Sequence, residues 1–172
     1  MKQIIFFVCL LTVAGVSASA TDFYPEDKAL SIIQKKLKNN SLEISGSFPL
    51  SESSEVGQRM MAYRFTEVGK QDVFYAVFTE SKGRYDLFDY LVIINSAAVV
   101  QKVAVIKYRS EHGGEIASKK WLSQFENYSG KPLQYGEDIS AISGATLSAG
   151  SITRDMQKVV LALKKQLENG EN

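Results

Sequence analysis

Four consecutive apolar segments between residues 60 and 108 constrain the fold of this chain more than any other feature of its sequence. These segments span 60–68, 72–79, 85–94 and 99–108. Apolar and aromatic side chains recur within them at the spacing of β-strands. Short connections such as Gly69-Lys70-Gln71 and Asn95-Ser96-Ala97-Ala98 suit hairpin loops. Because strands joined by short loops pair antiparallel, the pattern predicts an antiparallel sheet.

Helical patterns flank these segments on both sides. Apolar residues recur at helical spacing in 26–38, which follows a first-turn proline, Pro25, and again in 116–125. A longer apolar stripe predicts a final helix over Leu147–Glu168. The predicted loops are 39–57, with a short extended piece at Leu42–Ile44, and 128–138. The sequence therefore predicts an α+β fold, with helices packed at the side of an antiparallel sheet.

The first twenty residues have the pattern of a secretory signal peptide. A short basic start, Met1-Lys2-Gln3, precedes an almost wholly apolar run over 4–16 and the small-x-small site Ala18-Ser19-Ala20. The apolar run is short for a bilayer span, and an uncleaved membrane anchor is the alternative. We expect cleavage before Thr21, which makes 1–20 a signal peptide and 21–172 a single exported domain, periplasmic or associated with the cell envelope.

Composition argues against several classes of function. The chain has 20 basic and 19 acidic residues, so it lacks the broad positive field that favours nucleic acid as a partner. One His and one Cys cannot supply the roughly four ligands of a structural zinc site, and we predict no metal ligands. A hydrolase would depend on His112 alone, and His112 beside two glycines is more typical of a turn. No segment after the signal peptide is apolar for long enough to cross a bilayer.

The most informative stretch is Ser140-Ala141-Ile142-Ser143-Gly144-Ala145-Thr146-Leu147-Ser148, which directly precedes the long final helix. The first turn of a helix has unpaired N–H groups and a partial positive charge, and both favour a phosphate. Gly144 and Ala145 would leave room for a ligand to approach the backbone. The alternative is ordinary capping of the helix by hydroxyl side chains. Neither a GxGxxG nor a Walker motif is present, which disfavours an ordinary NAD or ATP site.

The segment Ser143-Gly144-Ala145-Thr146-Leu147-Ser148 resembles the signature of the FMN-binding domain family. That family includes the flavin-carrying subunits of the Na⁺-translocating NADH:quinone reductase and of the Rnf complex. In the family, a flavin transferase joins the FMN phosphate to the final threonine of the signature as a phosphoester. The resemblance therefore implies an FMN-binding-domain-like fold, FMN as cofactor, a flavin transferase as maturation partner and Thr146 as the attachment residue.

A second stretch is also similar to this family. The turn Tyr108-Arg109-Ser110-Glu111-His112-Gly113-Gly114-Glu115-Ile116 precedes Trp121-Leu122-Ser123-Gln124-Phe125, as in exported FMN-binding proteins. The resemblance covers about residues 72–163. It implies that backbone N–H groups of Gly144, Ala145, Thr146, Leu147 and Ser148 cradle the phosphate. With FMN at Thr146, we expect Gly113 and Gly114 to let the turn after Tyr108 approach the flavin ring, and Glu115, Ser143 and Ser148 to bond the ribityl chain or the ring edge. Tyr108 either stacks on the ring or covers the edge of the sheet.

One position departs from the family pattern. The family has an aspartate where this chain has Ser140, which leaves covalent attachment open. The sequence predicts an exported electron carrier, with a membrane-bound or exported redox partner and no catalytic residues of its own. One alternative is a flavin-dependent reductase of a small molecule, with His112 or Glu115 as proton donor. The other is a non-redox binding domain that has lost the flavin.

Overall fold

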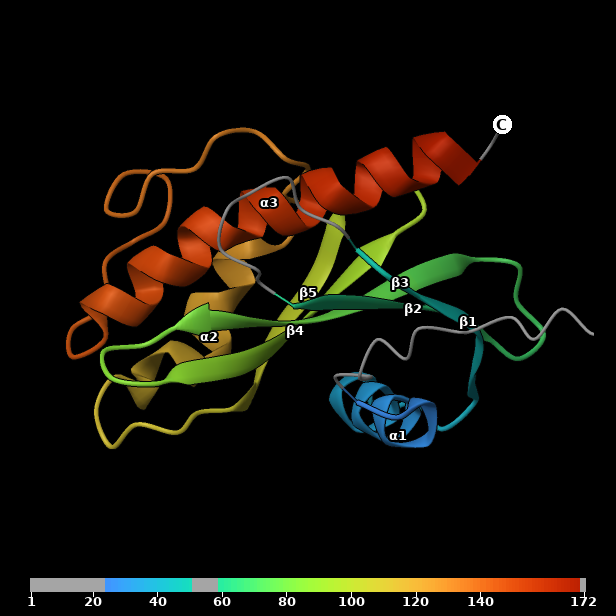
Figure 1. The fold of residues 1–172 in the computed structure, drawn as a ribbon, viewed down its shortest axis with the longest axis horizontal. Coiled ribbons are helices and arrows are strands. Elements are labelled where there is room, and N and C mark those ends of the chain that lie inside the picture. The colour runs from blue at the N-terminus through green and yellow to red at the C-terminus, as the bar shows by residue number, and fades with distance from the viewer. Residues whose placement is uncertain (1–23, 51–58, 171–172) are drawn as a thin grey trace, which may run out of the picture.

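The computed structural model describes residues 24–50 and 59–170 (Figure 1). The expected signal peptide, its cleavage site and the 51–57 part of the predicted loop lie outside the described residues. In chain order the elements are α1 (Glu26–Leu37), β1 (Leu42–Pro49), β2 (Met60–Glu67), β3 (Val73–Lys82), β4 (Leu87–Asn95), β5 (Val100–Lys107), the 3-10 helix η1 (Gly114–Ala117), α2 (Lys119–Leu122), the 3-10 helix η2 (Ser123–Phe125) and α3 (Thr146–Gly170).

The sheet has five strands in the order β1-β2-β3-β4-β5, and each strand is antiparallel to its neighbours. The predicted α+β class with an antiparallel sheet is therefore confirmed. The four strands expected from the sequence are present within a few residues of their predicted bounds. The largest difference is in β3, which continues to Lys82 because its last residues pair with the start of β4 at Leu87.

Of the predicted 39–57 loop, the extended piece at Leu42–Ile44 is confirmed, but the prediction of loop beyond it was wrong, because Leu42–Pro49 forms the edge strand β1. A bulge between Ile44 and Gly46 interrupts its pairing with β2. A bulge changes which face the following side chains occupy. Leu42 and Ile44 accordingly pack in the core beside α1, whereas Phe48 packs in the core beside α3. The backbone bonds to β2 stabilise a segment whose own composition favours a loop.

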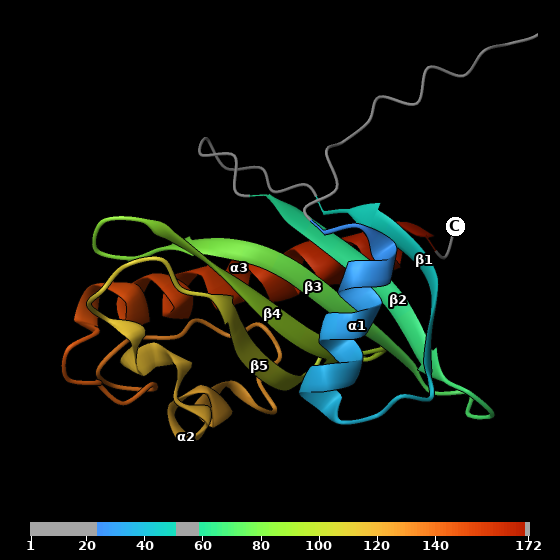
Figure 2. The ribbon, with the colours of Figure 1, turned by 90° about the horizontal axis from the view of Figure 1, so that it is seen from below.

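Helices cover both faces of the sheet, with α1 on one face and α3 on the other (Figures 1 and 2). Each helix packs against its own set of buried sheet residues, so the described residues form two apolar cores. Seven consecutive residues of β4 are buried, which fits a central strand covered on both sides. The 24-residue core beside α3 is the larger, and it also takes in Ile116, Trp121 and Phe125.

The predicted continuous helix over 116–125 was also wrong, because this stretch consists of η1, α2 and η2. Ser118 adopts an extended conformation with φ −59° and ψ 120°, and this interrupts the helix. Burial of the apolar residues on this segment maintains its position despite the break. The final helix is confirmed: α3 spans Thr146–Gly170, against a prediction of Leu147–Glu168. Within residues 24–50 and 59–170, no helix combines the length and apolarity needed to cross a membrane.

Candidate functional site

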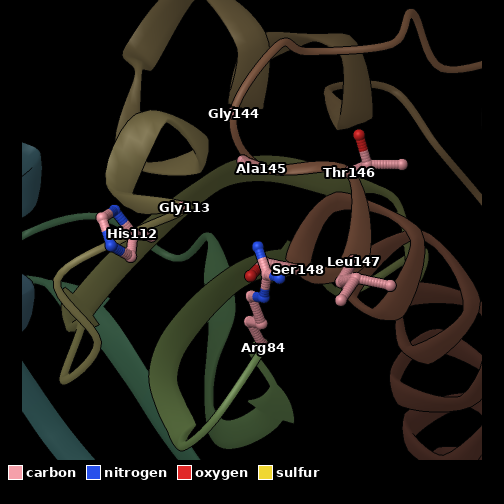
Figure 3. A pocket seen from close by; sticks show the side chains of 8 residues that line it. All are labelled: Arg84, His112, Gly113, Gly144, Ala145, Thr146, Leu147 and Ser148. Carbon is pink, nitrogen blue, oxygen red and sulfur yellow. The ribbon is translucent and has the colours of Figure 1, made fainter.

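Three segments that are distant in the sequence meet at the start of α3. They are the turn between β3 and β4, the turn after β5 and the segment that leads into α3. They enclose a pocket of about 260 Å³, lined by Arg84, His112, Gly113, Gly144, Ala145, Thr146, Leu147 and Ser148 (Figure 3). Ligand cavities usually measure roughly 300–1,000 Å³. This pocket therefore suits one end of a large ligand, such as its phosphate, better than the whole molecule.

The first turn of α3 forms one wall of the pocket. The helix begins at Thr146, and the amide of Ala149 makes the first bond of the helix to the carbonyl of Ala145, at 2.8 Å. The preceding N–H groups have no carbonyl one turn earlier within the helix, so they can serve an anion. The side chain of Thr146 is exposed, and that of Leu147 is 60% exposed. A hydroxyl and a large apolar side chain are thus presented side by side at the positive end of the helix.

Two turns of the site contain glycines at positions where the Cβ of any other residue would collide with a neighbouring side chain. Gly144 has φ +83°, and a Cβ on it would lie 2.9 Å from Oε1 of Glu115. Gly113 has φ +92°, and a Cβ on it would overlap the hydroxyl of Tyr108. Positive φ is costly for residues other than glycine, so both turns require glycine for conformation and for space. Glu115 consequently lies behind the Gly144 turn, outside the residues that line the pocket.

Tyr108 links two walls of the pocket, the turn after β5 and the first turn of α3. Its hydroxyl donates to the carbonyl of His112 and forms a hydrogen bond with Oγ of Ser148, each at 2.9 Å. Because a phenol carries one proton, Ser148 is the donor in the second bond. The ring of Tyr108 packs on Phe88 with 5.5 Å between centroids. In this position Tyr108 joins the turn after β5 to α3, and it lies outside the set of residues that line the pocket.

The two stretches that resemble the flavin family are in contact. Nε1 of Trp121 donates to the carbonyl of Ser140 at 2.7 Å, and the amide of Ser140 donates to Oε1 of Gln124 at 2.8 Å. Trp121 is buried and packs edge-on against Phe125. The backbone just before the Ser143–Ser148 motif is therefore held by the 121–125 segment, while the side chain of Ser140 is exposed.

The structure brings six of the ten predicted site residues into the lining of the pocket: Gly113, Gly144, Ala145, Thr146, Leu147 and Ser148. The other four surround it. Ser143 is exposed in the turn before Gly144, and Gly114 is exposed at the start of η1. Glu115 and Tyr108 support the two glycine turns, as described above.

Sequence reasoning missed Arg84. This residue comes from the turn between β3 and β4, about sixty positions before Thr146, and its side chain extends toward Ser148 (Figure 3). A Cβ on the neighbouring Gly83 would lie 3.5 Å from Oγ of Ser148, so this turn packs closely against α3. The only local signal was the basic-Gly-basic sequence Lys82-Gly83-Arg84 at a predicted hairpin. His112, which the sequence analysis interpreted as a turn residue and kept as a proton donor only in the reductase alternative, lines the same pocket.

The residues present fit the phosphate end of FMN. Helix N–H groups and a guanidinium are the donors that proteins use for phosphate, and an exposed hydroxyl can take part in a phosphoester. The apolar side chain of Leu147 offers a surface for a ring at the rim of the pocket. No protein-family model matches the sequence, and no curated protein matches it either.

Proposed function

We propose that this protein is an exported electron-transfer flavoprotein whose FMN is joined through its phosphate to Oγ1 of Thr146. One observation carries the proposal. The exposed hydroxyl of Thr146 lies at the first residue of α3, in the same pocket as Arg84 and the Gly113 turn. The resemblance of Ser143–Ser148 to the FMN-binding domain signature, and the α+β fold with helices on an antiparallel sheet, support it.

Each part of the pocket has a role in this proposal. The N–H groups of the first turn of α3 and the guanidinium of Arg84 balance the negative charge of the phosphate. Gly113 and Gly144 let their turns, which form part of the pocket wall, pack against Tyr108 and Glu115, where a Cβ would collide. Ser148 and Tyr108 fix the distance between the two walls through their hydrogen bond. When bound, FMN supplies the electron-transfer chemistry, and the protein holds and tunes it.

A covalent link suits an exported carrier. Association of a free small ligand has an entropic cost of about 4–15 kcal/mol, and a lost flavin is not readily replaced outside the cytoplasm. The proposal requires a flavin transferase for maturation and a membrane-bound or exported redox partner.

The decisive experiment is the intact mass of the mature protein co-expressed with a flavin transferase. The wild type should gain one FMN less one water, Thr146→Ala should gain nothing, and Thr146→Ser should keep part of the gain because it retains a hydroxyl. Ser143→Ala is the matched control, since it removes a neighbouring exposed hydroxyl and should leave the gain intact. Yellow protein without the mass gain would overturn the phosphoester. Colourless protein would overturn the flavin and support a non-redox binding domain.

A flavin-dependent reductase is the second candidate, and the position of His112 favours it. The imidazole lines the same pocket as Thr146, where it could donate a proton to a bound acceptor. A reductase would turn over a small-molecule acceptor and slow when His112 is replaced by Asn. A carrier would exchange electrons with a protein partner at the same rate in both forms.

A further inference from the structure

A second concave site lies along the outer edge of the sheet. It is a groove of about 540 Å³ bounded by α1, β5 and the segment from η1 to α2. Figure 2 shows α1 and α2 on either side of β5. In the described part of the chain, its lining shares no residue with the pocket at Thr146. We call it the lysine groove, after Lys35, Lys36, Lys38, Lys102 and Lys119.

The lysine groove concentrates positive charge that acidic residues do not balance. Its lysines come from α1 and the residue that follows it, Lys38, and from β5 and α2. Within residues 24–50 and 59–170, none of them forms an ion pair with a carboxylate. Burial lowers the pKa of Lys36, and the nearby charges of Lys35, Lys119 and Lys102 lower it further. Like charges held this close repel one another, and a bound anion would relieve that repulsion.

The floor of the groove is apolar. Val103, Ala104 and Leu122 are buried there, and Val105 continues the surface along β5. Nζ of Lys36 donates to the carbonyl of Val105 at 3.0 Å, so this lysine lies across the edge of the strand with its charge at the rim. Lysines that only protect an edge strand project into water. Here they surround an apolar depression whose volume is typical of ligand sites.

We propose that the lysine groove binds an organic anion with an apolar body, specifically a carboxylate- or phosphate-headed amphiphile. Lys36, Lys102 and Lys119 hold the charged head, and the floor formed by Val103 and Leu122 receives the chain. A small inorganic anion would leave the apolar floor uncovered, and a neutral amphiphile would leave the charges unbalanced. The ligand can come from solution as a free amphiphile or from a membrane as a lipid.

The test uses isothermal titration of the full mature protein with decanoate below its micelle concentration. Acetate provides the head without the chain, and decyl maltoside provides the chain without the charge. Decanoate should bind saturably at one site, and Lys102→Gln/Lys119→Gln should weaken it by about tenfold or more, as expected when charged contacts are lost. This variant leaves the Lys36–Val105 bond in place, and its thermal unfolding should match the wild type. Lys131→Gln/Lys165→Gln removes the same charge from exposed positions outside the groove and should bind normally.

The proposal would be overturned by a lack of saturable decanoate binding, or by equal weakening in both double variants. Binding that acetate or decyl maltoside reproduces would overturn it as well. Sedimentation with vesicles of phosphatidylcholine, with and without phosphatidylglycerol, separates the two sources. Groove-dependent sedimentation with phosphatidylglycerol indicates a membrane lipid, and decanoate binding without sedimentation indicates a free amphiphile. Thr146→Ala should leave both measurements unchanged, which keeps this proposal independent of the flavin.

Discussion

The two faces of the sheet are covered by helices that are held in different ways. The helix α3 has 25 residues, ten of them buried, and its apolar stripe includes Ile152, Met156 and Val159. The helix α1 has 12 residues, of which only Ala29 and Ile33 are buried. Burial of apolar surface therefore contributes far more to the position of α3 than to that of α1.

A polar cluster at the start of α1 adds to the small amount of apolar burial that holds this helix. The hydroxyl of Tyr24 donates to Oδ2 of Asp89 at 2.9 Å, and Arg109 contacts both oxygens of Asp89 at 2.8 Å. The hydroxyl of Tyr63 donates to the carbonyl of Tyr24. Because Asp89 is a buried carboxylate on β4, an interior strand, this cluster joins the entry of α1 to the sheet.

The difference bears on function. The pocket at Thr146 is built on the start of α3, and its position depends on apolar packing along the whole helix. The bond from Ser81 to Asp155, at 2.5 Å, adds a polar contact between β3 and the same helix. The lysine groove instead has one wall on α1, which buries fewer of its residues and is also attached through the polar cluster around Asp89. The two sites should therefore respond differently when one face of the sheet is weakened.

Asp89→Ala should produce the largest loss of stability. The change leaves the partly exposed Arg109 and the hydroxyl of Tyr24 without their shared partner, and each hydrogen bond to a charged group contributes about 1.5–3 kcal/mol. Urea unfolding measures the loss, and Asp86→Ala, at an exposed position on the same hairpin, should change little. The FMN mass gain per folded molecule should persist. A loss below about 1 kcal/mol would contradict the structural role given to this cluster.

Met156→Ala should cost slightly less stability but affect the other face. Met156 lies on the buried face of α3 and is fully buried, and a Met→Ala change in a core costs about 2–5 kcal/mol. Because the helix also carries Thr146, flavin attachment should fall along with stability. The same urea titration and the intact mass measure both effects. Leu161→Ala is the control on the same helix, since Leu161 is 45% exposed, and a comparable loss there would show that burial is not the cause.

The smallest effect concerns alkaline pH. Burial, together with the hydrogen bond to Asp89, raises the pKa of Tyr24 from 10.0 to about 12. The folded state then keeps a proton that the unfolded state loses, so this stabilisation is present below pH 10 and is lost as pH rises toward 12. The loss should amount to about 1–2 kcal/mol.

Unfolding midpoints measured from pH 8 upward should therefore fall less steeply in Tyr24→Phe than in the wild type. Tyr85→Phe, at a side chain that is 69% exposed, should follow the wild type. If the unfolding midpoints of the wild type and Tyr24→Phe fell in parallel with pH, the raised pKa of Tyr24 would be contradicted.

Most of the sheet could be predicted from the sequence because its signals are local. Alternating apolar residues and short loops located β2 to β5 within a few residues, and the apolar stripe located α3. The edge strand β1 could not be predicted, since its bonds to β2 compensate for a composition that favours a loop. The break at Ser118 was missed for a related reason: burial of Ile116 and Trp121 holds a segment whose helical periodicity is interrupted.

By itself, the sequence determined the fold class and the small, hydroxyl-rich segment at the start of α3, because both are set by neighbouring residues. Only the tertiary structure decided which distant residues come together with that segment to form the pocket. Arg84 reaches the pocket through the turn between β3 and β4, and Tyr108 bonds Ser148 across forty positions of sequence. The lysine groove likewise exists only where α1, β5 and α2 meet. Charge and space at such places depend on contacts between distant residues, which no local pattern encodes.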